Sequence, residues 1–559
     1  MAVPWTTSNA AYLLRRAGFG PTAAEVEECV ALGQQDAVSR LVDFESIDNS
    51  ALETRLTQLN LDLDDIFNLY YWWVYRMLYT ARPLEEKLTL FWHGHFATSF
   101  AKVNDTGFMY SQNQLLRQRG IGDFRTLLVE ISRDPAMLFW LDNAFSVKEA
   151  PNENYAREVM ELFSLGIGNY TQEDIREVAR CFTGWSYRGT AFAFIAGIHD
   201  TDAKTVLGHS IPAGRGIEDG LDVCTILADS PACAPFIARK LWRFFAAGEP
   251  PVAVRDRMVA AYVANSHSIR EMLRELFLSD EFYAPTATDE QIKSPLEMYV
   301  GTLRSLEASR DIVEYRDFRF FIYNTFIMGQ TLFFPPNVKG WDGGRKWINT
   351  STLIARYNFT NSVATIRGPG YQLVDVATLL ARANATTAEQ VVDALASLLG
   401  PLDVGTAARR RLVDYLRTQR DGSLGEFVLT TESIDSKVRG LLALLLSTAE
   451  YQANLKGPDA GVVRPVIVAP LLKNGKLVLG ASGSNIQPGA TVRVTGDEIS
   501  GTEVFVLSAK KPTKWIVGKK VISTPGGVTL GALLPVGRSA TLVVQNPDRG
   551  QSDPVDISH

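Results

Sequence analysis

The segment FRTLLVEISRDPAMLFWL, residues 124–141, shows the pattern that governs most of the chain. Its apolar residues recur three and four positions apart, which is the spacing of an amphipathic helix. The same spacing occurs in DGLDVCTILADSPACAPFIARKLWRFF, residues 219–245. We therefore predict a multi-helical core over residues 1–365. After an interruption at RGPGYQLV, we predict a helical continuation over residues 366–458.

The pattern changes after about residue 460. Short segments such as ATVRVTG and TEVFVLSA alternate apolar and polar residues, and Gly, Pro, Asn and Asp separate them, as between strands. Further strands are expected in VVRPVIVAP, residues 462–470, and GGVTLGALL, residues 526–534. We predict a small all-β immunoglobulin-like sandwich over residues 459–559. The predicted fold class is thus mainly α, with a small all-β domain at the C-terminus.

Composition narrows the range of functions. The 559 residues carry 56 Lys and Arg against 62 Asp and Glu, a net charge of −6, which argues against a protein that binds nucleic acid through phosphate contacts. No run of eighteen apolar residues predicts a membrane span, and no signal-peptide pattern is visible at the start. The sequence contains no CxxC motif, and we expect buried thiols at all four cysteines: Cys29, Cys181, Cys224 and Cys233.

One polar stretch is APNENYAREVMELFSLG, residues 150–166. Asn152 is a good N-cap for the helix that should follow. Three polar residues of that helix share one face at offsets zero, four and seven: Asn154, Glu158 and Glu161. Glu153 and Arg157 are spaced to form an ion pair. The segment is either a capped, salt-bridged surface helix or a polar face turned into the interior, where Glu158 and Glu161 offer carboxylates for a metal or for acid–base chemistry.

A second polar stretch is LFWHGHFATSF, residues 90–100. Pro83 suits the first turn of a helix that leads into it. We expect Gly94 to end or loosen that helix, so that His93 and His95 face the same way, which a continuous helix would forbid. Histidine is both a common metal ligand and a common general base. The alternative is that each histidine is a hydrogen-bonded packing residue.

A long loop, FFPPNVKGWDGGRKWINT, residues 333–350, contains Lys339 and Trp341. Together with Trp185 in CFTGW, Trp341 offers a flat apolar face beside polar groups, which suits a carbohydrate surface. The alternative is that these tryptophans anchor their segments to the core.

Taken together, the motifs resemble those of the DUF1800 family, from about residue 8 to residue 455. They occur in the family's order: LLRRAGFGPT, FWHGHF, PNENYAREVMELFSLG, YTQEDIREVARCFTGW, HDTDAKTVLG, KSPLE and PPNVKGWDGG. Many members have His at the position of Tyr12, so no metal-site role is expected there. The tail NPDRGQS resembles the closing strand of IPT/TIG domains, which act as spacers or adhesive modules on exported proteins.

The family's function is unknown, so the resemblance supplies no catalytic role. It implies a bacterial protein located outside the cytoplasm, often beside a second exported protein. It also implies that the shared polar residues form one site: His93, His95, Asn152, Glu153, Asn154, Arg157, Glu158, Glu161 and Glu177.

Three hypotheses follow, of which the first is preferred. In the first, the protein is a hydrolase that acts on a polysaccharide or another extracellular polymer. Its catalytic residues would be Glu153, Glu158, Glu161, Arg157, His93 and His95, and its substrate-binding residues Asn152, Asn154, Trp185, Lys339 and Trp341. In the second, a divalent metal is bound by His93, His95, Glu158 and Glu161. In the third, the chain is a non-catalytic scaffold or adhesion protein whose polar network is buried, self-paired and without a cavity.

Overall fold

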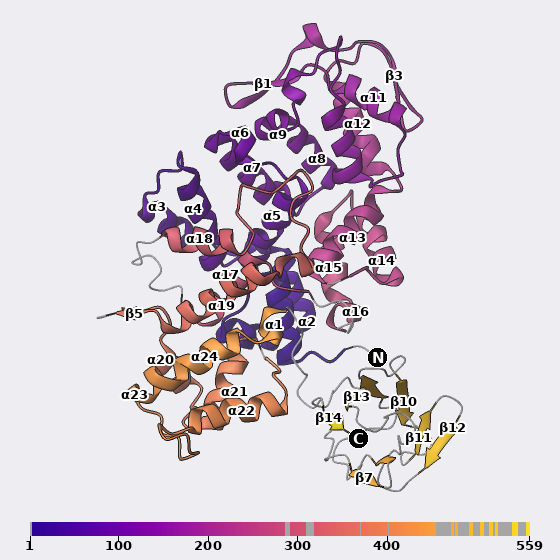
Figure 1. The fold of residues 1–559 in the computed structure, drawn as a ribbon. Helices are drawn as coiled ribbons and strands as arrows, with labels where there is room; N and C mark the ends of the chain where they lie inside the picture. Colours follow the sequence, from indigo (N-terminus) through magenta and orange to yellow (C-terminus); the bar gives the residue numbers. More distant parts are fainter. Residues whose placement is uncertain are drawn as a thin grey trace. The chain divides into compact units, whose positions relative to one another are not determined.

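The structure is a computed structural model of the chain (Figure 1). It describes residues 3–246, 248–284, 291–308, 318–368, 371–400 and 402–453, together with eight strands of the C-terminal region. The chain divides into two compact units. The first comprises Met1–Ala385, Ala394–Leu402 and Thr430–Lys456, and the second comprises Thr386–Asp393, Asp403–Leu429 and Gly457–His559.

The predicted helical body is confirmed. Up to Trp140 its helices are α1 (Thr7–Ala17), α2 (Ala23–Val42), η1 (Phe44–Ser46), α3 (Ser50–Leu59), α4 (Ile66–Tyr79), α5 (Pro83–His95), α6 (Phe100–Val103), α7 (Thr106–Arg119), α8 (Phe124–Arg133) and α9 (Pro135–Trp140). The next elements are η2 (Asn143–Phe145), α10 (Glu153–Glu158), η3 (Val159–Ser164), α11 (Gln172–Cys181), β1 (Trp185–Arg188), β2 (Ala191–Phe194), η4 (Ala196–Ile198), β3 (Lys204–Val206) and β4 (His209–Ile211).

The remaining helices continue the body. They are α12 (Glu218–Asp229), α13 (Cys233–Phe245), α14 (Val252–Ala264), α15 (Ile269–Leu278), α16 (Asp280–Tyr283), α17 (Pro295–Ser305), α18 (Phe318–Ile327), η6 (Gly344–Trp347) and α19 (Thr350–Thr365). The hairpin β5 (Arg367–Gly368) and β6 (Tyr371–Gln372) then interrupts the helices, where the sequence predicted a break. After it come α20 (Val376–Arg382), α21 (Ala388–Leu398), α22 (Thr406–Arg417), α23 (Thr431–Ser433), η7 (Ile434–Val438), α24 (Arg439–Leu446) and α25 (Ala449–Gln452).

Helix α5 lies in the middle of the first unit (Figure 1) and contacts α1, α2, α4 and α7. It begins at Pro83, as the sequence predicted. Nearly all of its residues are buried, charged ones included. The carboxylate of Glu86 accepts hydrogen bonds from Arg76 and Arg117, at 2.8 and 2.9 Å, and Lys87 donates to Glu297 at 2.6 Å. Because these buried charges are paired, the helix can hold the two histidines at its C-terminal end inside the protein.

In the described parts of the chain, no single helix is both long and apolar enough to cross a bilayer. Helices α12 and α13 satisfy that criterion only as a pair, with a 69° bend between them. Residues of both helices, including Val223, Leu227 and Leu241, belong to the hydrophobic core.

The C-terminal strands that the structure describes are β7 (Leu471–Lys473), β8 (Lys476–Val478), β9 (Thr491–Thr495), β10 (Glu503–Leu507), β11 (Lys514–Val517), β12 (Lys520–Ser523), β13 (Ser539–Gln545) and β14 (Val555–Ser558). Six of them form an antiparallel sheet in the order β12-β11-β10-β9-β13-β14, and β7 pairs with β8. The change to strands after about residue 460 agrees with the sequence pattern. The strands predicted at 462–470 and 526–534 lie outside the described residues.

Candidate functional site

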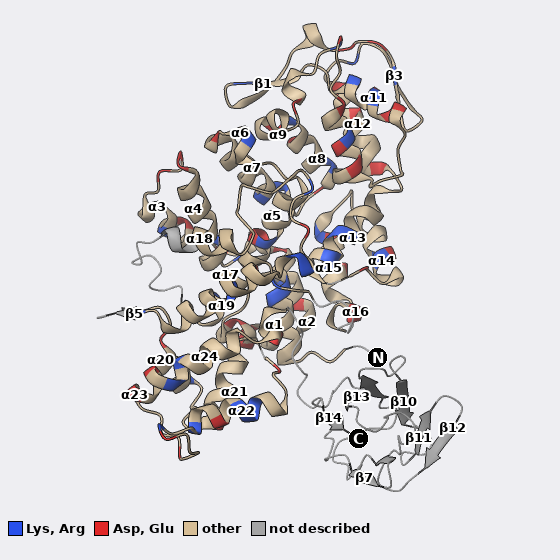
Figure 2. Cartoon of the chain, viewed as in Figure 1, with Lys and Arg blue, Asp and Glu red and all other residues tan. Residues whose placement is uncertain are grey.

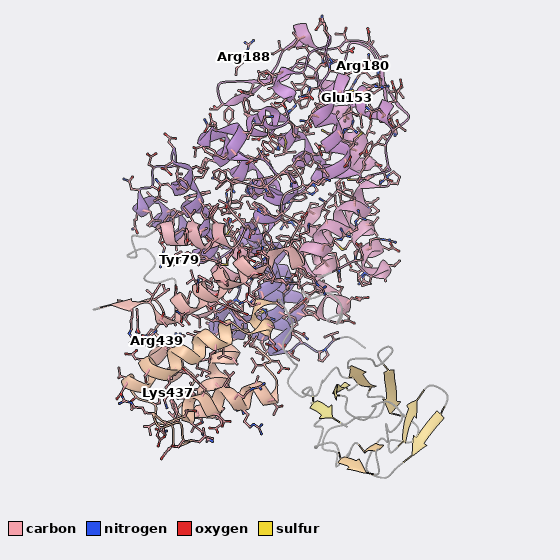
Figure 3. All side chains as sticks on the ribbon, in the orientation of Figure 1. Tyr79, Glu153, Arg180, Arg188, Lys437 and Arg439 are labelled. Carbon is pink, nitrogen blue, oxygen red and sulfur yellow. The ribbon has the colours of Figure 1, made fainter. Side chains whose placement is uncertain are left out.

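The polar segment that starts at Asn152 forms α10, as predicted. The side chain of Asn152 caps the helix by accepting from the backbone N–H of Asn154 at 2.8 Å. Glu153 and Arg157 form the expected ion pair, at 3.5 Å. Glu153 also accepts a hydrogen bond from Gln172 at 2.8 Å, and it lies beside α11 in the part of the molecule that contains Arg180 (Figure 3). This end of the segment is therefore a paired, half-exposed surface.

The helix does not keep its α-helical spacing beyond Glu158. Residues Val159–Ser164 form a π-helical turn, η3, after which the backbone N–H groups of Leu165 and Gly166 both donate to the carbonyl of Met160. The α-helical spacing behind the single polar face expected for Asn154, Glu158 and Glu161 therefore ends before Glu161, although Glu158 and Glu161 stay close enough for their charges to interact. Such turns are rare and occur often at functional sites.

Glu161 lies on this π-turn. Its carboxylate accepts a hydrogen bond from the hydroxyl of Tyr170 at 2.5 Å. Burial and the nearby Glu161 raise the pKa of Tyr170 to about 12, so the hydroxyl remains a donor. Glu158, one residue before the turn, has no hydrogen-bond or ion-pair partner among the described residues. Burial and the negative charge of Glu161 raise its pKa.

Helix α5 continues through both histidines, so the expected break at Gly94 is wrong. Neighbouring aromatic rings, including those of Trp92 and Phe96, pack around this end of the helix and bury it. His93 and His95 consequently point in different directions and make different contacts, as the geometry of a continuous helix requires.

His93 holds a loop in place. Its Nε2 atom accepts a hydrogen bond from the backbone N–H of Phe333 at 3.1 Å, so the ring proton is on Nδ1. The ring also packs against Trp73, Phe333 and Trp341. Burial lowers the pKa of His93 to about 3, which keeps the ring neutral. These contacts match the packing alternative for this residue.

His95 connects α5 with the π-turn. Its Nε2 atom lies 3.0 Å from the carbonyl oxygen of Phe163, which can only accept, so Nε2 carries the proton. The other nitrogen, Nδ1, is buried and has no hydrogen-bond partner among the described residues. Burial, followed by the charge of Lys240, lowers the pKa of His95 far below its usual value. The ring is therefore neutral, with an unused lone pair on Nδ1.

The loop from Phe333 to Trp347 reaches the end of α5 through two glycines. Gly340 has a positive φ of 75°, and a Cβ atom at this position would collide with the carbonyl oxygen of Gly94. Only glycine permits both the backbone conformation and the close approach. This contact places Lys339 and Trp341 near the histidines.

These elements line a cavity that is open to the surface and has a volume of about 820 Å³. Four of the predicted site residues line it: His95, Glu161, Lys339 and Trp341. The two polar segments thus contribute to one site. Other charged residues in its wall are Lys240, Arg243, Glu297, Asp342 and Arg345. We call this space the central cavity.

The other predicted site residues do not line the central cavity. The side-chain amides of Asn152 and Asn154 donate to the carbonyl oxygen of Leu141, at 3.0 and 3.4 Å. Trp185 is fully buried against Phe182 and Phe192, so the prediction that its ring stacks on a substrate is wrong. The core-anchoring alternative describes Trp185.

The predicted four-ligand metal site is not brought together. Within the described ranges, no group of three or more His, Cys, Asp and Glu side chains is arranged to hold a metal ion. The nitrogen of His93 that carries a lone pair already accepts from Phe333. The four cysteines are free and buried, as expected.

The HDTDAK motif forms a separate buried cluster. Lys204 donates to the carbonyl oxygens of Asp200 and Asp202 and to the carboxylate of Asp219, at 2.6, 2.8 and 2.7 Å. His199 faces the same carboxylate at 3.1 Å and the carbonyl oxygen of Thr183 at 2.8 Å. We call these residues the closed cluster, because they fix the β3 hairpin to α12 without opening onto the central cavity.

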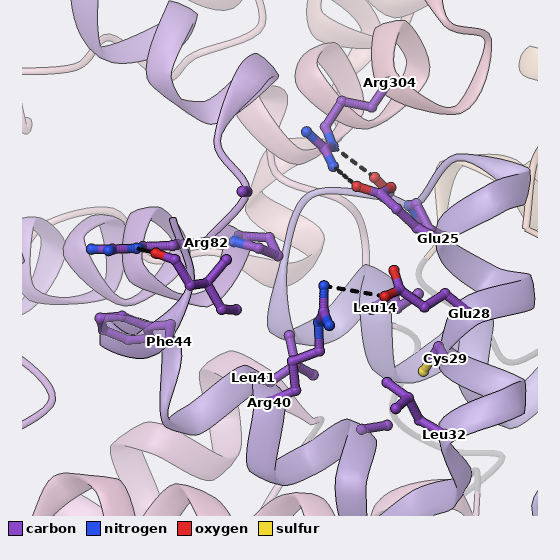
Figure 4. A pocket seen from close by; sticks show the side chains of 16 residues that line it. Leu14, Glu25, Glu28, Cys29, Leu32, Arg40, Leu41, Phe44, Arg82 and Arg304 are labelled. Carbon is purple, nitrogen blue, oxygen red and sulfur yellow. Dashed lines mark hydrogen bonds and ion pairs between the residues drawn. The ribbon is translucent and has the colours of Figure 1, made fainter. Parts of the chain in front are cut away.

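A smaller hollow of about 190 Å³ lies between α1, α2 and the start of α5 (Figure 4). Its floor is apolar, with Leu14, Leu41 and Phe44 among its residues. Ion pairs Arg304–Glu25, at 2.6 Å, and Arg40–Glu28, at 3.2 Å, close its rim. Because these rim charges already have partners, the hollow lacks the unpaired polar groups of the central cavity.

Comparison with known proteins agrees with this set of motifs. The family model described as "Protein of unknown function (DUF1800)" matches residues 12–453. The chain belongs to the DUF1800 family. No curated protein and no solved structure matches it. All residues that line the central cavity of this DUF1800 chain lie within the matched range.

Sequence reasoning missed Lys240, Arg243 and Tyr170 in this DUF1800 site. Tyr170 directly precedes the capping box of α11, in which Thr171 and Asp174 cap each other as predicted. Its position next to a recognised motif was an available signal. Lys240 and Arg243 lie on α13, whose basic residues are blue in Figure 2. Nothing in their spacing shows which of them faces a cavity.

Proposed function

We propose that this DUF1800 protein is a hydrolase that cleaves a polysaccharide or another extracellular polymer in the central cavity. The observation that carries the proposal is the meeting of His95 and Glu161, from two separate motifs, beside Trp341 in one cavity. Enzymes that hydrolyse glycosides usually do so with carboxyl groups, here next to an aromatic ring.

The two carboxyl groups suit different roles. Glu158 is not part of the cavity wall, but its carboxyl lies close enough to the wall residues Glu161 and Lys339 to feel the charge of both. Burial and the charge of Glu161 raise its pKa, which favours the protonated form, and this carboxyl acts as the general acid. Glu161 accepts a hydrogen bond from Tyr170, and its carboxylate acts as the general base. Glu158 gives its proton to the glycosidic oxygen as the bond from that oxygen to the sugar carbon breaks. Glu161 takes a proton from the water whose oxygen bonds to the same carbon. Solvent then returns both groups to their starting states.

His95 and Trp341 position the substrate. The free lone pair on Nδ1 of His95 accepts a hydrogen bond from a sugar hydroxyl, because the N–H on Nε2 is fixed to Phe163. Trp341 is partly exposed in the cavity wall and offers its ring to the apolar face of a sugar. Lys339 is exposed in the same wall.

The cavity favours an enzyme over a non-catalytic scaffold. A scaffold requires the polar network to be self-paired and without a cavity, whereas Nδ1 of His95 is buried in the cavity wall and unpaired among the described residues. Leaving a buried polar group unpaired costs about 1–3 kcal/mol, which a ligand that hydrogen-bonds to it would recover. A location outside the cytoplasm and an IPT/TIG-like role for the C-terminal sheet belong to the same proposal, since an extracellular polymer is reached only there.

The test is release of new reducing ends from a panel of neutral and acidic polysaccharides by the full chain. We expect Glu161→Gln and Glu158→Gln to lower kcat by about 10²- to 10⁴-fold. Glu153→Gln is the matched control, because Glu153 is a paired surface residue of the same segment, and we expect it to retain the parent rate. The proposal is overturned if no polymer yields new reducing ends, or if Glu161→Gln cleaves at the parent rate.

A further inference from the structure

We infer that the substrate of the central cavity is an anionic glycan, with sugar units that carry carboxylate or sulfate groups bound by Lys240, Lys339 and Arg345. The identification of the substrate as a glycan rests on the proposed function. Its negative charge is inferred from the charges of the cavity wall alone.

The carboxylates of the cavity wall already have partners in the protein. Glu161 accepts from Tyr170, Glu297 accepts from Lys87 at 2.6 Å, and Asp342 pairs with Lys346 at 2.9 Å. Their charges or acceptor atoms are thus engaged before any ligand arrives. Lys87 and Lys346 neutralise Glu297 and Asp342, whereas the neutral hydroxyl of Tyr170 does not offset the charge of Glu161, so an anionic ligand meets one uncompensated carboxylate in the wall.

The cations of the wall are mostly without such partners. Arg243 pairs with Glu249. For Lys240, Lys339 and Arg345, the described residues supply no carboxylate within ion-pair distance and no hydrogen-bond acceptor for the side chain. Glu158 lies near enough to Lys339 for the two charges to interact, so the charge of Lys339 is partly compensated. The charges that act on Lys240 are those of Arg239 and Arg243, both positive, and this excess of cations around one cavity makes a binding site for negative charge.

Of the three cations, Lys240 gives the strongest evidence for an anion-binding site, because it is half-buried. Burial, with the neighbouring charges of Arg239 and Arg243, lowers the pKa of its amine to about 8. An ammonium group at such a position lacks both full hydration and a counter-charge. A bound carboxylate or sulfate supplies the missing charge, so the site gains by binding one.

Other groups indicate a sugar polymer rather than a small inorganic anion. The cavity of about 820 Å³ exceeds the space that one such ion fills. The unpartnered Nδ1 of buried His95 is an acceptor, which suits a hydroxyl and not an anion. A nucleic acid fits less well, because the chain as a whole has a net charge of −6.

The experiment measures binding of short oligosaccharides by calorimetry. The protein is the full chain with Glu158→Gln, which slows turnover and replaces no residue of the cavity wall. The probes are a galacturonate oligomer, a sulfated oligosaccharide and a neutral dextran oligomer, so that the first two distinguish carboxylate from sulfate. We expect at least one anionic oligomer to bind about tenfold or more tightly than the neutral one.

Variants identify the cations. Lys240→Met and Lys339→Gln are each expected to weaken binding of the anionic oligomer about tenfold. Arg257→Gln is the control, because it removes an exposed charge on α14 outside the cavity wall, and we expect unchanged affinity. Lys339 lies on an exposed loop, so its variant remains informative if Lys240→Met does not fold. Equal affinity for the neutral oligomer, equal losses for Arg257→Gln, or tighter binding of a single-stranded RNA would overturn the inference.

The cleavage and binding experiments together distinguish failure of the inference from failure of the proposed function. Glu161-dependent cleavage of neutral polymers, without preference for acidic ones, overturns the anionic substrate and keeps the hydrolase. Lys240-dependent binding of an acidic oligomer that is never cleaved overturns the hydrolase and keeps the anionic site.

Discussion

The closed cluster and the central cavity contain the same residue types, but the lysine and histidine are fully paired in the first and not in the second. Each contains a buried histidine, a carboxylate and a lysine. In the closed cluster, all three donors of Lys204 find oxygen acceptors within 2.8 Å, and both nitrogens of His199 face oxygen atoms. In the central cavity, Lys240 has no acceptor among the described residues, and Nδ1 of His95 is unpaired.

The difference separates structural polar groups from functional ones. A buried charge that is matched by its neighbours contributes to a defined fold, whereas an unmatched one must find its partner in a ligand. Residue type and burial alone therefore do not identify a site. Unused hydrogen-bonding capacity next to a cavity does.

The strongest test of this comparison replaces one lysine in each region. We expect Lys204→Met to lower the free energy of unfolding by about 3–5 kcal/mol, because it leaves Asp219 buried with one partner fewer. Lys240→Met should change it by about 1 kcal/mol or less, because no ion pair is lost. Urea unfolding of the full chain, followed by far-UV circular dichroism, measures both. Equal losses would mean that Lys240 has a structural partner.

A second test uses one glycine in each region. Gly184 has φ 76°, and a Cβ atom there would lie 2.7 Å from the carbonyl oxygen of Ile195, while Gly340 has φ 75° and meets Gly94. Alanine at either position should cost roughly 1–3 kcal/mol of stability from backbone strain. Only Gly340→Ala should also weaken binding of the anionic oligomer, because it displaces Lys339 and Trp341. Thermal unfolding and calorimetry distinguish the two effects, and loss of binding in Gly184→Ala would contradict the separation of the regions.

The smallest expected effect comes from the histidines of α5 at low pH. Burial lowers the folded-state pKa of His93 and His95 below 6.5, so the unfolded chain binds more protons below that pH. Each histidine should then reduce stability by up to about 1.4 kcal/mol per pH unit as the pH falls from 6.5. Stability should be independent of these residues above pH 7.

Urea unfolding at several pH values between 7 and 4.5 measures this slope. His95→Gln should make the loss of stability per pH unit smaller by the contribution of one histidine. His209→Gln, at an exposed position, should leave it unchanged. An equal slope in the parent and His95→Gln would show that His95 is already charged in the folded protein.

The sequence by itself determined the helical body and many of its boundaries. The three-and-four spacing of apolar residues, Pro83 at the start of α5, Asn152 as an N-cap and the capping box at Thr171 are local signals, because they depend on residues within one or two turns. The motifs also indicated His95, Glu161, Lys339 and Trp341, which the fold brings together.

Only the tertiary structure decided which polar residues are functional candidates. A π-turn replaces the α-helical spacing at Glu161, α5 continues through Gly94, and Trp185 is buried, none of which local spacing predicts. Lys204 finds its oxygen acceptors on other segments of the chain, whereas the described residues give Lys240 only the ring of Phe236, at 5.2 Å. Whether a buried polar group is satisfied is a property of its three-dimensional surroundings. For the lysine and histidine side chains that property separates the closed cluster from the proposed site, while Oδ1 of Asp219 in the cluster is also buried without a partner among the described residues.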